Sequence, residues 1–295
     1  MLLGCISVHA QQDALFSQYM FNPFAINPGY AGSRDAVSGV LLHRNQWAGL
    51  DGAPKTTTLA LHSPFKGKHF ALGLNVFSES IGPSANQGAF LTYAYRMRMP
   101  VGKLALGLRG GLYTSRFDKS KLNYNDPGDK FDTDGVVKAA APSFDFGLYY
   151  NTNHIFLGAS VSHLGEIGSN FDDQTQTKLE LKRHYILSGG GAIELSKKLV
   201  YKPSVIVKIV AGAPISIDIN SSFLIKKIVW LGASYRTSKS LVLITEFNIT
   251  DFLRLGYSYD MIFNQLSSYN NGSHELFIGF DFAIKKQQSV SPRYL

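Results

Sequence analysis

The sequence predicts an all-β protein, an antiparallel transmembrane β-barrel of about fourteen strands, with an irregular N-terminal segment that plugs the lumen or its periplasmic mouth. Three observations lead to this prediction. Beyond residue 34, apolar side chains recur at every second position, which is the period of a strand. The connections between the expected strands alternate between tight and long. The stretch before the first strand combines Asn-Pro steps with many aromatic residues.

The composition is typical of a membrane barrel. Only 17% of the 295 residues are charged, against roughly 25% in an ordinary soluble domain. No apolar run reaches the length of about 18 residues that a transmembrane helix needs, whereas a barrel carries its membrane signal in alternation. The net charge of +8 is spread over short connections between strands, so it does not indicate a nucleic-acid surface.

Residues 1–10 are predicted to be a signal peptide. They form a short apolar leader that ends in Val8-His9-Ala10, which suits cleavage before Gln11. The leader lacks a basic start, so a true start upstream of Met1 stays open. The alternative is a lipoprotein signal with an acylated Cys5, but the four residues Leu2-Leu3-Gly4-Cys5 are too few for the required hydrophobic region.

Residues 11–34 are expected to be irregular. Proline lacks an N–H donor and restricts the residue before it, so Asn22-Pro23 and Asn27-Pro28 argue against a helix or a regular strand. The aromatic content is nevertheless too high for a free tail. We therefore expect this segment to lie against the barrel, inside the lumen or across its periplasmic mouth.

The barrel is expected over residues 35–286, followed by a periplasmic tail over residues 287–295. Counts of twelve or sixteen strands stay open, because strand ends read from a sequence are uncertain by a few residues. The expected strands are 35–47, 56–65, 69–78, 87–98, 102–115, 143–151, 154–163, 182–194, 199–210, 215–226, 227–235, 240–250, 252–260 and 273–285.

The lengths of the connections give an independent test. With both termini in the periplasm, periplasmic turns should be short and outer loops long. The expected short turns are 66–68, 99–101, 151–153, 196–198, 226–227 and 250–251. The expected outer loops are 48–55, 79–86, 116–142, 164–182 and 261–272, with 211–214 and 236–239 as short exceptions.

Each expected strand has one apolar face and one face of small or charged residues, which should point into the lumen. Glycines recur on that inward face, at Gly73, Gly107, Gly147, Gly158, Gly232, Gly256 and Gly279. They fit either the coiling of strands in a closed barrel or room for an inserted segment. Arg44, Arg109 and Arg254 also fall on inward faces, and Asp145, Asp260 and Asp281 are their expected partners in cross-lumen ion pairs.

The sequence carries no nucleophile elbow, phosphate loop, dinucleotide fingerprint or metal spacing of Cys and His, so we expect neither catalysis nor a cofactor. The eight histidines are scattered singly. One acidic loop is a weak calcium candidate through Asp126, Asp129, Asp132 and Asp134. Its spacing lacks the closing glutamate of a calcium loop, which favours a solvated turn-rich loop and no metal site.

The N-terminal part resembles a known family. The matching stretches are Gln12-Asp13, Phe16-Ser17-Gln18-Tyr19-Met20-Phe21-Asn22-Pro23, Asn27-Pro28-Gly29-Tyr30-Ala31-Gly32-Ser33, Arg44-Asn45-Gln46-Trp47 and Gly52-Ala53-Pro54-Lys55-Thr56. This ordered set resembles the PorP/SprF family, outer-membrane proteins of Bacteroidetes linked to type IX secretion and gliding motility. The C-terminal Arg293-Tyr294-Leu295 departs slightly from the Arg-Tyr-Phe-like end of that family.

The resemblance implies a non-enzymatic outer-membrane component that anchors a secreted protein or assists its surface display. The implied partners are an adhesin with a C-terminal sorting domain, periplasmic and outer-membrane components of the secretion system, and outer-membrane lipid. The outer loops 116–142 and 164–182 would be the docking surface. A diffusion channel is the alternative, and a barrel enzyme lacks a visible catalytic set. The structural or recognition candidates are Asn22, Pro23, Asn27, Pro28, Tyr30, Gly32, Arg44, Gln46 and Trp47, the last at a strand end suited to the membrane interface.

Overall fold

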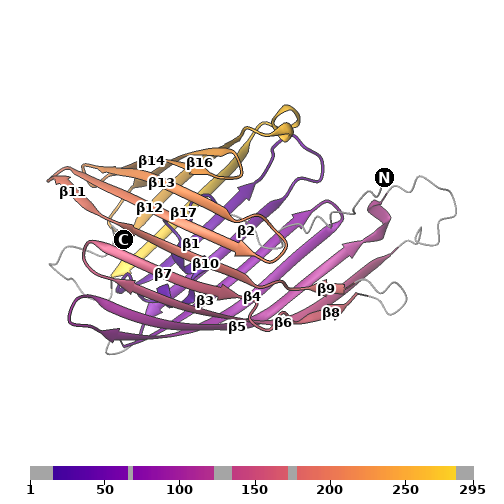
Figure 1. Ribbon diagram of the computed structural model, residues 1–295, viewed down its shortest axis with the longest axis horizontal. Helices are drawn as coiled ribbons and strands as arrows, with labels where there is room; N and C mark the ends of the chain where they lie inside the picture. The colour runs from indigo at the N-terminus through magenta and orange to yellow at the C-terminus, as the bar shows by residue number, and fades with distance from the viewer. Residues whose placement is uncertain (1–15, 66–68, 123–134, 172–177, 284–295) are drawn as a thin grey trace, which may run out of the picture.

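The computed structural model describes residues 16–65, 69–122, 135–171 and 178–283. Within these ranges, fourteen antiparallel strands form one closed barrel (Figure 1). The wall consists of β1 (Ala36–Asn45), β2 (Lys55–Pro64), β3 (Phe70–Ile81), β4 (Ser84–Arg98), β5 (Lys103–Asp118), β6 (Val136–Asn151), β7 (Ile155–Ser162), β10 (His184–Gly191) with its continuation β11 (Ile193–Ser196), β12 (Leu199–Val210), β13 (Ser216–Ile225), β14 (Val229–Arg236), β15 (Ser240–Asn248), β16 (Leu253–Ile262) and β17 (Ser273–Ala283). The predicted all-β, antiparallel barrel of about fourteen strands is confirmed.

Neighbours in the chain are neighbours in the wall, and two pairings close the ring. The first strand β1 pairs with the last strand β17, and β10 pairs with β12. The long connection between β7 and β10 carries a separate two-stranded hairpin, β8 (Gly168–Asn170) and β9 (Lys178–Glu180). Short 3-10 turns, η3 (Lys119–Lys121) and η4 (Gln265–Tyr269), lie in two other connections on that side. Among the described residues, no helix has the length and apolar character needed to span a bilayer.

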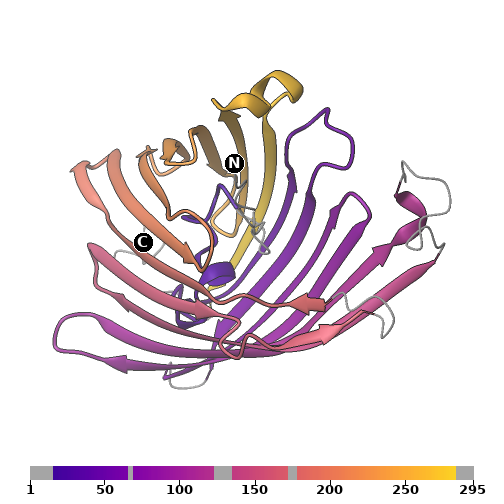
Figure 2. The same ribbon diagram turned by 45° about the vertical axis from the view of Figure 1, so that its right-hand side comes forward.

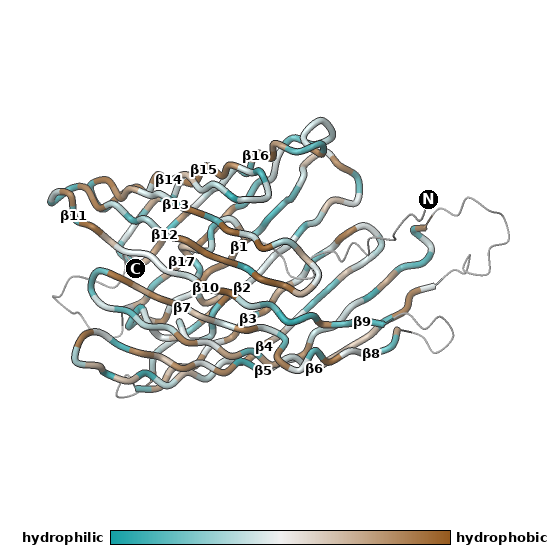
Figure 3. Tube along the Cα trace, viewed as in Figure 1, coloured by the Kyte–Doolittle hydropathy of each residue, from teal (hydrophilic) through white to brown (hydrophobic). Residues whose placement is uncertain are grey.

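The strict alternation of the sequence corresponds to two different surroundings. Along β16, Arg254, Ser258 and Asp260 are buried, whereas Leu255 and Tyr257 between them are exposed on the outer face. Figure 3 shows polar and apolar residues alternating along the wall strands. The small and charged face therefore points inward and the apolar face outward, as a transmembrane barrel requires.

The two ends of the barrel differ in their connections. The turns after β2, β4, β6, β11, β13 and β15 are tight, and the connections from β1 to β2, β5 to β6, β7 to β10 and β16 to β17 are long. We call these the short-turn end and the long-loop end. The expected outer loop 79–86 is wrong: β3 continues to Ile81 and β4 begins at Ser84. Gly82, with φ of +52°, makes the tight turn between them.

The N-terminal residues 16–34, here called the luminal segment, lie inside the barrel and are surrounded by its wall (Figure 2). The expectation that Asn-Pro steps exclude helix is wrong locally. Pro23 and Pro28 begin a single helical turn, α1 (Pro23–Ile26), and a 3-10 turn, η1 (Pro28–Tyr30). A proline is tolerated in the first turn of a helix because the N–H of that position needs no intrahelical partner.

Candidate functional site in the barrel lumen

The luminal segment packs its aromatic side chains against inward-facing residues. Phe21 lies 6.0 Å from the ring of Trp230 and 6.3 Å from that of Phe277. On the other side, Tyr30 makes an edge-to-face contact at 5.0 Å with Tyr149. Burial of such rings contributes apolar stabilisation inside the lumen. The segment is thus part of the folded core of the barrel.

A carboxylate holds the start of the segment. The fully buried Glu275 of β17 accepts hydrogen bonds from the backbone N–H of Ser17 at 2.9 Å and of Gln18 at 2.8 Å. The guanidinium of Arg44 contacts the same carboxylate at 3.2 Å and donates to Ser17 Oγ at 2.7 Å. Arg44 also pairs with Asp260 at 3.1 Å. Charge-assisted bonds of this kind are stronger than neutral ones.

A guanidinium holds the middle of the segment from the opposite direction. Arg109 of β5 donates to the carbonyl of Ala25 at 3.0 Å and also to the carbonyl of Phe24. Its guanidinium stacks over the Phe24 ring at 5.1 Å and pairs with Asp145 of β6 at 3.5 Å. The backbone carbonyls around α1 are thereby satisfied by a wall side chain.

The turn at Asn27-Pro28 sits on wall positions that lack side chains. The amide of Asn27 donates to the carbonyl of Leu148 at 2.8 Å, and its oxygen accepts from Gly29 N–H at 2.8 Å. A Cβ at Gly107 would overlap the backbone of Pro28 and Gly29, and one at Gly147 would overlap Asn27. The inward glycines at these positions therefore leave room for the segment.

The other recurrent glycines divide between those that face the segment and those that face the wall. A Cβ at Gly73 would overlap Phe24, and one at Gly256 would come within 2.7 Å of Gln18. At Gly232 and Gly279 the nearest atoms belong to the wall itself. For these two, strand coiling remains the better interpretation.

The end of the segment is held near the short-turn end. Gly32, at a φ of +73°, donates its N–H to His62 Nδ1 at 3.1 Å. Arg34 pairs with Asp281 at 2.6 Å and donates to the hydroxyl of Tyr30 at 3.2 Å. Burial alone would lower the pKa of the Arg34 guanidinium, but the Asp281 carboxylate raises that pKa above its usual value.

The three inward arginines pair with the carboxylates expected from the sequence, but the pairs do not run across the lumen as expected. Arg44 pairs with Asp260, Arg109 with Asp145, and Arg254 with Asp281 at 3.1 Å. These pairs join adjacent or next-but-one strands along the wall, so they do not cross the lumen. The segment is linked to the wall by two of these arginines, Arg44 through Ser17 and Arg109 through Phe24 and Ala25. Arg34 and Glu275 add further links that the sequence pattern did not indicate.

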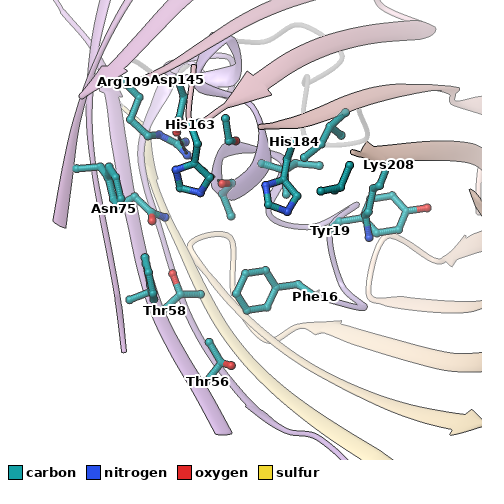
Figure 4. A pocket seen from close by; sticks show the side chains of 17 residues that line it. Phe16, Tyr19, Thr56, Thr58, Asn75, Arg109, Asp145, His163, His184 and Lys208 are labelled. Carbon is teal, nitrogen blue, oxygen red and sulfur yellow. Dashed lines mark hydrogen bonds and ion pairs between the residues drawn. The ribbon is translucent and has the colours of Figure 1, made fainter. Parts of the chain in front are cut away.

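A cavity lies in the lumen against the luminal segment, with about 120 Å³ of space for the centres of water molecules. Figure 4 shows Phe16 and Tyr19 of the segment facing it together with polar wall residues. Burial raises the pKa of the Tyr19 hydroxyl. The labelled wall residues are Thr56, Thr58, Asn75, Arg109, Asp145, His163, His184 and Lys208.

The remaining sequence candidates lie in two places. Asn22 is buried at the start of α1, and its side-chain Nδ2 has no hydrogen-bond partner. Gln46 and Trp47 lie in the loop after β1, where Gln46 N–H donates to Pro54 O at 2.9 Å and Trp47 N–H to Ser273 Oγ at 3.1 Å. Trp47 has a φ of +50° and belongs to the loop at the long-loop end, two residues beyond the end of β1.

The calcium candidates Asp126, Asp129, Asp132 and Asp134 lie outside the described residues, as do the signal peptide 1–10 and the tail 287–295. Among the described residues, no group of His, Cys, Asp and Glu could hold a metal ion.

Comparison with known proteins gives one family and a general structural likeness. Residues 8–280 match the family described as type IX secretion system membrane protein PorP/SprF. No curated protein matches the chain. Among solved structures, the CymD monoaromatic hydrocarbon channel is 11% identical with a TM-score of 0.49, covering 89% of this chain and 92% of that one. A FadL homologue of Pseudomonas aeruginosa is 10% identical with a TM-score of 0.48, covering 84% of this chain and 88% of that one. Omp33 of Acinetobacter baumannii is 10% identical with a TM-score of 0.45, covering 84% of this chain and 100% of that one.

Proposed function

Because the chain belongs to the PorP/SprF family of type IX secretion system membrane proteins, we propose that it is a non-enzymatic outer-membrane barrel that anchors a secreted protein or assists its surface display. The family match covers residues 8–280 and confirms the resemblance that the N-terminal stretches indicated. The proposed cargo is an adhesin with a C-terminal sorting domain. The other proposed partners are periplasmic and outer-membrane secretion components and the surrounding lipid.

One observation favours an anchor over an open pore: the lumen contains the luminal segment. Glu275 and Arg34 connect the segment to the wall on the β17 side, and Arg109 connects it on the β5 side. We propose that the segment closes the lumen to solutes, which would make the barrel a membrane-fixed platform. The anchoring would then use the rim of the barrel.

The orientation of the platform is part of the proposal. Outer-membrane barrels have short periplasmic turns and longer outer loops. We propose that the short-turn end faces the periplasm, with both termini, and that the long-loop end faces the cell surface. Secretion components would then meet the short-turn end, and the exported protein the long-loop end.

A diffusion channel is the second candidate. The cavity beside Phe16 and Tyr19 favours it, because a solute could occupy that space. The contacts of the segment count against it, since passage through the barrel would require the segment to move.

The test is affinity purification of the tagged barrel from gently solubilised envelopes, with a planar-bilayer recording of the same sample. We expect a large exported protein with a sorting domain, or a periplasmic secretion component, in near-stoichiometric amount and no wide, stable pores. A barrel that is purified alone and conducts ions would support the channel instead.

A further inference from the structure

The wall has a step where β7 ends. β6 is sixteen residues long, but β7 is only eight and pairs with β6 between Phe146 and Asn151. In Figure 1, β5 and β6 run on past the end of β7 toward β8 and β9. On its other side, β6 pairs with β5 along its whole length, from Asn151 to Val136. Residues 136–142 of β6, here called the open edge, thus have a strand partner on one side only among the described residues.

The departure of the chain from this edge is fixed by specific contacts. His163, directly after β7, has a φ of +54°, and its N–H donates to Asp145 Oδ1 at 3.0 Å. Its ring Nδ1 lies 2.7 Å from Ser143 Oγ. Arg183 then donates to the carbonyl of Leu164 at 2.7 Å, which ties the two ends of the connection together. A left-handed residue held by its neighbours is a built turn, so β7 does not continue along β6.

The direction in which the backbone N–H and C=O groups of the open edge point follows from one hydrogen bond. The last contact on this side is the N–H of Leu164 donating to the carbonyl of Phe144 at 2.8 Å. In an antiparallel strand, residues two apart direct their N–H and C=O to the same side. The groups of Pro142, Ala140 and Lys138 therefore point away from β5 and have no strand to pair with among the described residues.

The open edge lies beyond the lipid-facing band of the barrel. Outward residues of β6 below it are large and apolar, such as Phe144, which is 51% exposed. In the register with β5, Leu112 is opposite Pro142, and above this pair Arg116 is opposite Lys138. Outward charges mark the water side of the interface, so a polypeptide can reach this edge from solvent.

Neither β8 nor β9, the described strands of the hairpin, pairs with the open edge. Leu179 of β9 and the following Leu181 belong to one buried cluster with Ala139 and Ala141, whose side chains point into the lumen. The hairpin therefore packs on the inner face of β6 and forms a sheet separate from the wall.

We propose that the open edge, residues 136–142, is where an extended strand of the exported protein pairs with the barrel. This inference rests on the proposed function, because it takes the occupant from it. Unpaired backbone donors and acceptors in a strand are a template for an added strand.

The edge also defines the chemistry of the incoming strand. On its inner face, the strand lies beside the small side chains of Ala139 and Ala141, next to Leu179, and takes apolar residues there. On its outer face it lies near Lys138 and takes an acidic or polar residue. Pro142 has no N–H, so no backbone carbonyl of the incoming strand can accept a hydrogen bond at that position. A second copy of this chain fits less well, because it would bring Lys138 near its own counterpart.

The experiment begins with the partner. Surface biotinylation of a deletion strain defines the exported proteins whose display depends on this chain. In the full-length protein, a photo-crosslinking residue at Ala140 is then compared with one at Asn153, in the β6–β7 turn at the opposite end. We expect the Ala140 crosslinker to trap one of the dependent proteins through a single extended segment, and the Asn153 crosslinker not to trap it.

A pair of variants tests the backbone itself. Ala140→Pro removes one N–H that points out of the open edge, whereas Ala140→Ser keeps it. We expect Ala140→Pro to lose most of the dependent surface protein and Ala140→Ser to retain it, with heat-modifiable gel mobility checking that both barrels are folded. If Ala140→Pro does not fold, the crosslinking result alone decides.

Three results would overturn the proposal: full display in a folded Ala140→Pro variant, crosslinks only within the chain, or crosslinks only between barrels. If deletion of the whole chain changes no surface protein, the proposed function itself fails. If deletion abolishes display but the open edge is dispensable, only this inference fails.

Discussion

The seat of the luminal segment can be tested with one methyl group. Gly107 of β5 faces the backbone of Pro28 and Gly29, and a Cβ there would overlap both. Backbone atoms cannot rotate away as a flexible side chain can. We therefore expect Gly107→Ala to push the segment away from the wall. Gly110, on the same strand, is the matched control, because its Cβ would meet only the side chain of Phe144, at 3.2 Å.

The magnitude follows from the cost of overpacking, which is about 1–3 kcal/mol for an added methylene in a packed site. The cost falls on the seated state only, so the population of the unseated state should rise by about five- to 150-fold. Gly110→Ala leaves the seat of the segment unchanged and should not alter that population.

The assay is thiol labelling of a reporter, Ser33→Cys, a near-isosteric change at a buried position of the segment. We expect maleimide to react slowly with the reporter in the parent barrel and in Gly110→Ala, and to react faster in Gly107→Ala by the factor above. The sole natural cysteine, Cys5, lies in the expected leader. Equal rates in the two glycine variants would refute the reasoning, because the wall would then not be seating the segment.

Three further predictions concern the ion pairs, the prolines and the acidic loop. Asp281→Asn removes the carboxylate shared by Arg34 and Arg254, and should lower the free energy of unfolding by about 3–5 kcal/mol in urea titrations of the refolded barrel. Neutralising the exposed Glu180 should produce no measurable change. The double change Pro23→Ala and Pro28→Ala should loosen the segment by about 0.4–1 kcal/mol per site and impair partner assembly more than membrane insertion; normal surface display would contradict this. Calorimetry of the refolded barrel with millimolar calcium should give no binding heat, and a saturable signal would restore the acidic loop as a metal site.

The strand number could be predicted because each wall strand faces two different surroundings, lipid outside and a polar lumen inside. That contrast puts the period of two directly into the sequence, as in Leu255, Gly256, Tyr257 and Ser258. The same polar lumen explains the error at residues 79–86. Glu79 and Asn86 look like loop residues, yet both belong to strands, where their side chains hydrogen-bond to each other at 3.3 Å.

The path of the luminal segment could not be predicted in detail. Its defining contacts join residues far apart in the chain, as in the bond from Ser17 to Glu275. The alternation indicated only that residues such as Arg44 point inward. Glu275 also points inward, but nothing in the sequence around it indicates that it binds the segment. The open edge was also missed, although the expected strand 154–163 is close to β7. The expected strand 143–151 left residues 136–142 in a loop, whereas β6 begins at Val136.

The ends of the luminal segment and the turn between them are held by different kinds of contact, and this bears on how the segment could move. Ser17 and Arg34 are held by carboxylates on β17, through charge-assisted bonds that a change of protonation or a competing ion would weaken. The turn at Pro28 is held by shape, against wall glycines that offer no side chain to move. Loss of the charged contacts alone would therefore free the ends and leave the turn seated, so the segment could loosen without opening the lumen. Full release would require a change in the β5–β6 wall itself. That wall also carries the open edge of β6, and a strand added there would act on the same two strands that seat the turn.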